Sequence, residues 1–325
     1  MSIDLQLSKL RMKITGTSDI RDFEILQPSA LLVCLTRYLG KIEIINLKTR
    51  RCLRVLSLHK PNVVSLHFNK MLVHNAGVLC CLQARKMFQS SVFICNIKTN
   101  RNISIPFEYS NSTRSIALLG DLLITAGLSS KIRFWEITTG EFVDDICFQR
   151  NSVCVSNLTP CEEKLMLVCV EETTNSMWLV SLQSKKLVRS IPLDIDRNGA
   201  ILTPFGNNFA SFIPNQKTIS FWSVVEGQHD LFNFKFLDKT QVDSFCSFHF
   251  IEEEEGQTDQ VLYTTATGLK CRKISTNQVV SEIDVNWQLK GTKRSYFNAL
   301  EGGRAIQISK KNVFLHDGVN ILVIS

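Results

Sequence analysis

Residues 131–140, Lys131-Ile132-Arg133-Phe134-Trp135-Glu136-Ile137-Thr138-Thr139-Gly140, are the stretch of sequence on which the fold prediction depends. Polar and apolar residues alternate from Lys131 to Phe134, and Thr-Thr-Gly ends the stretch. Alternation with a period of two that runs into turn residues predicts a β-strand ending in a tight turn. Shorter strand-like segments flank it at residues 115–119, 121–126 and 141–148. We therefore predict four consecutive strands in this part of the chain.

The same element recurs along the whole chain. Each copy has a polar residue among apolar ones and continues into a turn; the central polar residues are Asn46, Asn96, Glu136, Ser181, Ser223, Lys273 and His316. Neighbouring copies are about 40 to 50 residues apart, the period of a four-stranded propeller blade. No amphipathic helix of about a dozen residues interrupts them. The sequence therefore predicts an all-β protein, a seven-bladed β-propeller of four-stranded antiparallel blades.

We predict a single propeller domain over residues 1–325. The predicted blades are residues 21–60, 62–110, 114–150, 152–196, 199–238, 242–288 and 292–325. Residues 1–20 remain, and within them residues 5–15 alternate like a strand that would complete the last blade and close the ring. Residues 319–324 compete for that role, and the sequence does not choose between the two.

The stretch 131–140 resembles the third strand and following turn of a WD repeat, and Phe221-Trp222-Ser223 resembles it more weakly. The chain thus resembles the WD-repeat (WD40-like) β-propeller family, with degenerate repeats. The Gly-His pair of that family, and its Asp before the third strand, are not recognisable in any copy. The resemblance implies a non-catalytic interaction platform. The missing residues imply that the blades depend more on apolar packing between neighbours than on a hydrogen-bonded network.

Composition and cysteine usage indicate a folded protein of a reducing compartment. Hydrophobic residues make up 44% of the 325 residues, yet no apolar run approaches the roughly 18 to 20 residues of a membrane-spanning helix. The eleven cysteines are odd in number and form no Cys-x-x-Cys pair, which predicts free thiols and neither disulfides nor a zinc site. We expect no signal peptide, no membrane insertion, and a location in the nucleus, the cytoplasm or both.

No motif in the chain indicates catalysis. The six histidines lie in different predicted blades or in apolar strand-like settings, and no serine has a nucleophile-elbow motif. Residues 299–304 lack the glycine spacing and the lysine of a phosphate-binding loop. We therefore predict that the protein is not an enzyme and has no catalytic, cofactor-binding or metal site.

Charged and apolar residues of predicted loops are the candidate interaction residues. Basic residues in the turns after third strands are predicted on one rim: Lys48, Arg50, Arg51, Lys98, Arg101, Lys185 and Lys186. Apolar loop residues that are candidate interface contacts are Phe88, Phe205 and Trp287. The block Glu252, Glu253, Glu254 and Glu255 predicts an exposed loop that docks a basic partner or maintains solubility.

We therefore predict a scaffold for protein–protein interactions, working as a monomeric ring within a eukaryotic multiprotein complex and binding its other subunits. One alternative is a substrate or phosphopeptide receptor in ubiquitin ligation, which requires arginines that converge on the central channel of one face. Another is an RNA-associated accessory subunit in tRNA modification or mRNA processing and export, which requires a continuous positive surface. The net charge of +7 is compatible with an acidic partner. The sequence identifies neither the complex nor the binding face.

Overall fold

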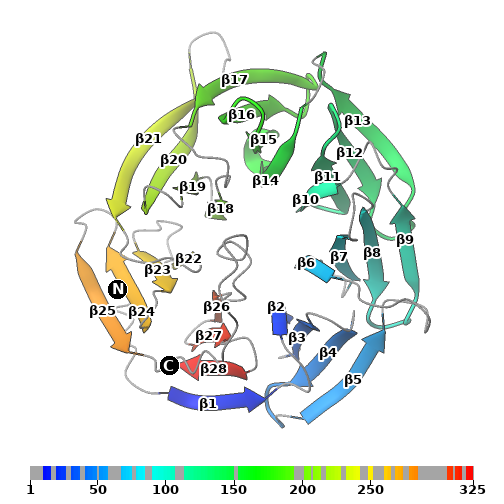
Figure 1. Ribbon diagram of the computed structural model, residues 1–325, viewed down its shortest axis with the longest axis vertical. Coiled ribbons are helices and arrows are strands. Elements are labelled where there is room, and N and C mark those ends of the chain that lie inside the picture. Colours follow the sequence, from blue (N-terminus) through cyan, green and yellow to red (C-terminus); the bar gives the residue numbers. More distant parts are fainter. Residues whose placement is uncertain are drawn as a thin grey trace. The chain divides into compact units, whose positions relative to one another are not determined.

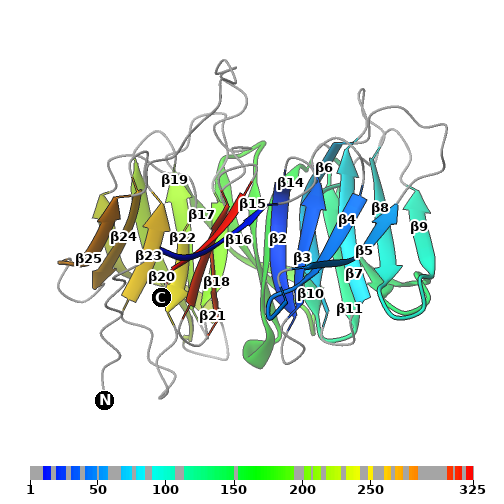
Figure 2. The same cartoon turned by 90° about the horizontal axis from the view of Figure 1, so that it is seen from below.

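The computed structural model of the chain is built from short antiparallel strands (Figures 1 and 2). It describes residues 10–15, 20–26, 31–36, 41–49, 51–57, 67–74, 78–84, 90–106, 113–149, 153–193, 201–205, 208–213, 217–227, 232–241, 248–251, 260–264, 268–273, 278–284, 306–309, 312–316 and 320–324. These residues form seven four-stranded sheets in two compact units. None of them belongs to a helix long and apolar enough to cross a membrane.

Unit 1 comprises residues 1–71 and 242–325. One of its sheets has the order β2 (Ile20–Leu26), β3 (Leu31–Thr36), β4 (Lys41–Asn46), β5 (Arg51–Ser57). A second has the order β22 (Phe248–Ile251), β23 (Gln260–Thr264), β24 (Gly268–Lys273), β25 (Val279–Asp284). The third has the order β1 (Leu10–Thr15), β28 (Asn320–Ile324), β27 (Asn312–His316), β26 (Ile306–Ser309).

Both termini contribute to that third sheet. Strand β28 pairs with β27 on one side and with β1 on the other, with Lys13 opposite Leu322 and Ile14 opposite Ile321. Both terminal segments were predicted to complete the last blade, and they occupy different positions in this sheet. The C-terminal strand is its third strand, and the N-terminal strand is its fourth. The pairing between residues about 310 apart in the chain joins the two ends of the polypeptide within unit 1.

Unit 2 comprises residues 72–241. It contains the end of β6 (His67–Val73), which pairs in a sheet with β7 (Val78–Ala84), β8 (Ser90–Asn96) and β9 (Asn102–Pro106). The next sheet is β10 (Thr113–Leu119), β11 (Leu122–Gly127), β12 (Lys131–Glu136), β13 (Phe142–Cys147). It is followed by β14 (Val155–Cys161), β15 (Met166–Glu171), β16 (Ser176–Ser181), β17 (Lys186–Pro192). The last is β18 (Ile201–Phe205), β19 (Asn208–Ile213), β20 (Thr218–Glu226), β21 (Phe232–Gln241).

The sheets of unit 2 are held together by apolar packing between neighbours. Ile124 and Phe134 of the β10–β13 sheet share one core cluster with Leu167 and Trp178 of the β14–β17 sheet. Every residue of β15 is buried, because this strand is covered on both faces. Continuous apolar sequence rather than alternation is expected for a strand in that position.

Hydrogen bonds between a side chain and the backbone of the turn explain why the repeat is visible in the sequence. The side-chain oxygen of Asn46 accepts the backbone N–H groups of Lys48 and Thr49 at 2.9 Å, and Asn96 makes the equivalent bonds to Lys98 and Thr99. Asparagine is favoured in turns because its side chain can replace a backbone acceptor in this way. In five of the sheets the central polar residue is therefore the last residue of the third strand, whereas Ser223 lies within β20 and His316 ends β27, the second strand of its sheet.

The fifth residue of that turn has a left-handed backbone. Asn100, Gly140 and Lys185 occupy equivalent positions and have φ values of 62°, 74° and 55°. Gly140 also has a packing reason, because a Cβ atom there would lie 2.7 Å from Cγ2 of Ile103. Glycine at this position satisfies both the backbone conformation and the close approach of the neighbouring sheet.

Candidate functional site

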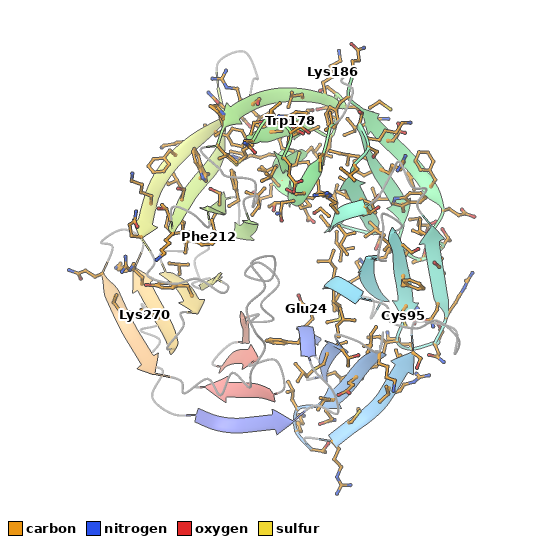
Figure 3. The ribbon with its side chains drawn as sticks, in the orientation of Figure 1. Glu24, Cys95, Trp178, Lys186, Phe212 and Lys270 are labelled. Atoms are coloured by element: carbon orange, nitrogen blue, oxygen red, sulfur yellow. The ribbon has the colours of Figure 1, made fainter. Side chains whose placement is uncertain are left out.

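The predicted basic residues that the structure describes are all exposed. Lys48 and Lys98 lie in the turns after β4 and β8, Arg101 directly precedes β9, and Arg51 and Lys186 begin the fourth strands β5 and β17. In Figure 3 the side chain of Lys186 points away from the sheets. Arg50, Phe88, Trp287 and Glu252–Glu255 lie outside the described residues, and Phe205 is the last residue of strand β18 rather than a loop residue.

Lys185 joins two neighbouring sheets of unit 2. Its ammonium group forms an ion pair with Asp144 on the fourth strand of the preceding sheet. The hydrogen bond from Lys185 is the main reason why the pKa of Asp144 lies below its usual value. Asp145, the next residue of β13, is paired with Lys131 of β12 at 2.7 Å. The surface around β13 therefore carries charges of both signs that largely neutralise each other.

A β-bulge recurs in the fourth strands. Most fourth strands contain one residue that the pairing with the third strand skips; these are Arg11 of β1, Leu53 of β5, Val143 of β13, Val188 of β17, Leu237 of β21 and Val280 of β25. Strand β9 is paired without such a shift. A bulge bends an edge strand and disturbs its free hydrogen-bonding edge, which discourages edge-to-edge pairing with another sheet. All of these skipped residues except Arg11 are apolar, which protection of the edge alone does not require.

The bulges coincide with exposed apolar side chains. Of the large apolar residues that are strongly exposed in the described part of the chain, all but Leu165 lie on fourth strands: Leu53, Val55, Phe142, Val143, Phe236, Leu237 and Val279. Phe142 and Val143 are each 53% exposed, although scattered single exposures are ordinary in soluble proteins. Here the exposed residues other than Leu165 all lie on fourth strands, and such a concentration is not expected if exposure were scattered over the surface.

Two of these exposed residues rest on a tryptophan. Phe142 lies edge-on to Trp135, with ring centroids 5.5 Å apart, and Phe236 lies edge-on to Trp222 at 5.2 Å. Each indole N–H donates a 2.9 Å hydrogen bond to a hydroxyl on the second strand of its sheet. Trp135 donates to Thr125, and Trp222 donates to Ser211. The exposed phenylalanine is thereby supported by a ring whose orientation is set from beneath. A rigid aromatic side chain loses little conformational entropy when it binds.

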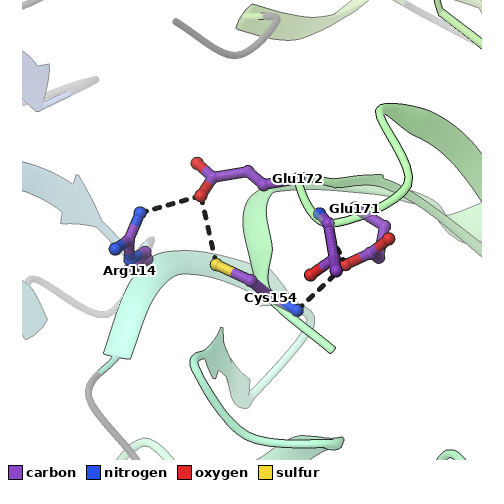
Figure 4. A network of polar contacts seen from close by, with 5 residues as sticks. Arg114, Cys154, Glu171 and Glu172 are labelled. Carbon is purple, nitrogen blue, oxygen red and sulfur yellow. Dashed lines mark hydrogen bonds and ion pairs between the residues drawn. The ribbon is translucent and has the colours of Figure 1, made fainter. Parts of the chain in front are cut away.

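A polar network connects strand β10 with the residues next to strands β14 and β15 of the neighbouring sheet in unit 2 (Figure 4). Arg114 donates to Glu172 at 2.8 Å, and the thiol of Cys154 donates to the same carboxylate oxygen at 3.1 Å. Burial and the Glu172 carboxylate raise the pKa of the Cys154 thiol to about 12. A thiol with such a pKa is almost entirely protonated at neutral pH and is a poor nucleophile or metal ligand. This network is therefore structural.

Buried thiols elsewhere behave in the same way. Burial raises the pKa of Cys161 and of Cys271 to about 11. The described part of the chain contains no group of three or more His, Cys, Asp or Glu residues able to hold a metal ion. No disulfide joins the eight cysteines whose side chains are described. Among the described residues the exposed fourth strands are thus the strongest candidate for a functional surface.

The sequence did not identify this surface. Lys185, predicted as an interaction residue of one rim, is paired with Asp144, and the exposed apolar residues of β5, β13 and β21 were not among the predicted contacts. One signal was available: in β5, β13, β17 and β25 the bulged residue follows the central polar residue of its repeat by seven positions, as Leu53 follows Asn46. Which residue bulges nevertheless depends on pairing with another strand.

Comparison with known proteins confirms the fold. No family model matches the chain, and no curated protein matches it. In contrast, 1642 chains of solved structures match, so the fold is widespread and does not by itself define a function. One is the β-propeller domain of Cps50 (Swd1) from Myceliophteria thermophila, with a TM-score of 0.70 and 11% sequence identity over 98% of this chain and 99% of that one.

The predicted all-β propeller fold is therefore confirmed, and the resemblance to WD repeats stays a prediction. The described residues supply seven four-stranded sheets. Their closure into one seven-bladed domain over residues 1–325 stays a prediction. An identity of 11% extends the likeness to the fold alone.

Proposed function

We propose that the protein is a non-catalytic scaffold that binds other proteins through the fourth strands of its sheets, as a subunit of a multiprotein complex. The observation that carries this proposal is the repeated exposure of apolar residues at the bulges of those strands. Phenylalanine and other aromatic residues are enriched in protein interfaces, where a few well-supported side chains contribute most of the binding energy.

The charges around these strands favour protein partners over RNA. Asp144 and Asp145 lie on β13 close to Phe142. A phosphate backbone requires a continuous positive surface, which the acidic residues of β13 interrupt. No disulfide joins the eight cysteines whose side chains the structure describes, which is compatible with the proposed location of the complex in the nucleus or the cytoplasm.

Affinity purification tests the proposal. The tagged protein is recovered from its native cell at physiological salt, at high salt and after nuclease treatment, and the proteins that remain bound are identified by mass spectrometry. The variant Phe142→Ser with Val143→Ser is compared with wild type. Hot-spot residues contribute about 2 kcal/mol or more each, so we expect recovery of at least one bound protein to fall about tenfold or more.

Leu165→Asn is the matched control. Leu165 is as exposed as Phe142, at 53%, but lies outside the fourth strands, and its φ of 49° is a conformation that asparagine tolerates well. The control should recover the same proteins as wild type. Loss of every bound protein after nuclease, or equal loss with both variants, would contradict a specific protein-binding surface on the fourth strands.

A further inference from the structure

Strand β5 differs from the other fourth strands in its charge. From Arg51 to Val55 every residue is exposed, and Leu53 and Val55 are 57% and 46% exposed. The preceding turn adds the exposed Lys48. The one acidic residue described between positions 41 and 57 is Glu43, which is buried at 1% exposure in β4. The exposed surface of this hairpin is therefore basic and apolar, with no acidic side chain of its own.

The bulge at Leu53 changes the direction of one arginine. Arg51 pairs with Asn46 and Arg54 pairs with Ile44, and these two partners lie two residues apart on β4. Residues opposite each other on neighbouring strands point to the same face of a sheet, as do residues two apart on one strand. Arg51 and Arg54 therefore share one face, although residues three apart in a regular strand point to opposite faces. Their Cα atoms are spaced like those of neighbours on one side of the strand.

The equivalent strand β13 lacks this basic character. Its bulged residue, Val143, is 53% exposed and is followed by Asp144 and Asp145, which are paired with Lys185 and Lys131. The bulged Leu53 of β5 has Arg51 on one side and Arg54 on the other. The same backbone feature thus exposes an apolar residue between cations in one sheet and beside charges of both signs in another, so β5 favours an acidic partner more than β13 does.

We propose that β5, with the turn residue Lys48, binds a protein segment in which carboxylates alternate with apolar side chains. The Arg51 and Arg54 guanidinium groups bind the carboxylates, for which their planar donor pairs are suited, and Leu53 and Val55 contact the apolar side chains. This inference rests on the proposed scaffold function and adds the chemistry of one partner. RNA is a poorer fit, because Leu53 and Val55 gain nothing from phosphates and β5 contains no aromatic residue on which bases would stack.

Fluorescence anisotropy with the full chain tests this proposal. The probe is a labelled synthetic ten-residue peptide in which Glu alternates with Leu, and its control replaces every Glu with Gln. We expect wild-type protein to bind the Glu peptide and Arg51→Glu with Arg54→Glu to weaken binding about tenfold or more. Leu53→Ser, which leaves all charges in place, should weaken binding less but measurably. Binding of the Glu peptide should also fall as ionic strength rises.

Leu165→Asn is the matched control, because it alters a comparably exposed apolar residue outside the fourth strands and leaves β5 intact. It should bind the Glu peptide as wild type does. Equal binding of the Glu and Gln peptides, equal loss with Leu165→Asn, or a labelled poly-uridine RNA that binds with higher affinity and the same dependence on Arg51 and Arg54 would overturn the proposal. Circular dichroism of each variant confirms that it is folded.

Failure of this inference can be distinguished from failure of the proposed function. If the arginine variant recovers the same proteins as wild type in the affinity purification while Phe142→Ser with Val143→Ser does not, the scaffold function stands and the acidic-partner inference fails. If one acidic partner is lost with the arginine variant, and at least one other protein is lost with Phe142→Ser with Val143→Ser, both stand.

Discussion

Replacement of Glu171 by Gln should destabilise the protein by about 3 kcal/mol at neutral pH. The Glu171 carboxylate is only 1% exposed, at the end of β15. It accepts the backbone N–H groups of Cys154, Thr173 and Thr174 at 3.1, 2.9 and 2.7 Å, and the Thr174 hydroxyl at 2.5 Å. A hydrogen bond to a charged group contributes about 1.5–3 kcal/mol, and an amide keeps one acceptor oxygen where the carboxylate has two.

The expected pH dependence follows from the pKa of Glu171. Burial opposes its ionisation, but the bonds from Thr174, Cys154 and Thr173 outweigh burial and lower the pKa below the ordinary value. A group whose pKa is lower in the folded state contributes stability above the unfolded pKa, and that contribution is lost as pH falls through the folded pKa. The difference in the free energy of unfolding between wild type and Glu171→Gln should therefore be largest at pH 7 and decrease below about pH 4.

Thermal unfolding followed by tryptophan fluorescence gives the measurement. The entropy of unfolding is about 2.1 cal/mol/K per residue, so 3 kcal/mol lowers the Tm by about 4 °C if all 325 residues unfold together, and by about 8 °C if unit 2 unfolds separately. Glu172→Gln is the control, because that carboxylate is partly exposed and its pairing contributes about 1 kcal/mol or less. A Glu171→Gln protein as stable as wild type, or a deficit that stays constant at low pH, would refute the reasoning.

Three further outcomes are expected from the same structure. Gly140→Ala should destabilise the protein by about 2 kcal/mol or more in urea unfolding, since it combines a φ of 74° with a steric overlap. Gly120→Ala, with a φ of 52° and nothing within 4 Å of the added Cβ, should cost only about 1 kcal/mol, and equal costs would contradict the steric explanation. Trp135→Phe should destabilise the protein by about 2 kcal/mol, because it removes the hydrogen bond from the indole to Thr125 and part of the ring contact with the exposed Phe142. Iodoacetamide at pH 8 should label the exposed Cys147 and leave Cys154 unlabelled in the folded protein, as peptide mass spectrometry would show; rapid labelling of Cys154 would contradict its raised pKa.

Local chemistry made the repeated strands and turns of this protein predictable. The side chain of Asn46 bonds to residues two and three positions later, and the residues of β12 alternate along one strand. Such interactions involve neighbours in the sequence, so their pattern is visible there as a period and as an all-β composition. The same reasoning located exposed basic turns, because turn residues are polar for a local reason.

The candidate site depends on strand pairing and was decided by the tertiary structure. Lys185 meets Asp144 across two sheets, β1 completes a sheet whose other strands lie about 300 residues later, and Arg51 and Arg54 share a face because β4 skips Leu53. In each case the deciding contact joins residues that are distant in the sequence or shifted by one position in register. Because a shift of one residue exchanges the two faces of a strand, the pattern of one strand alone does not determine which of its side chains reach a partner.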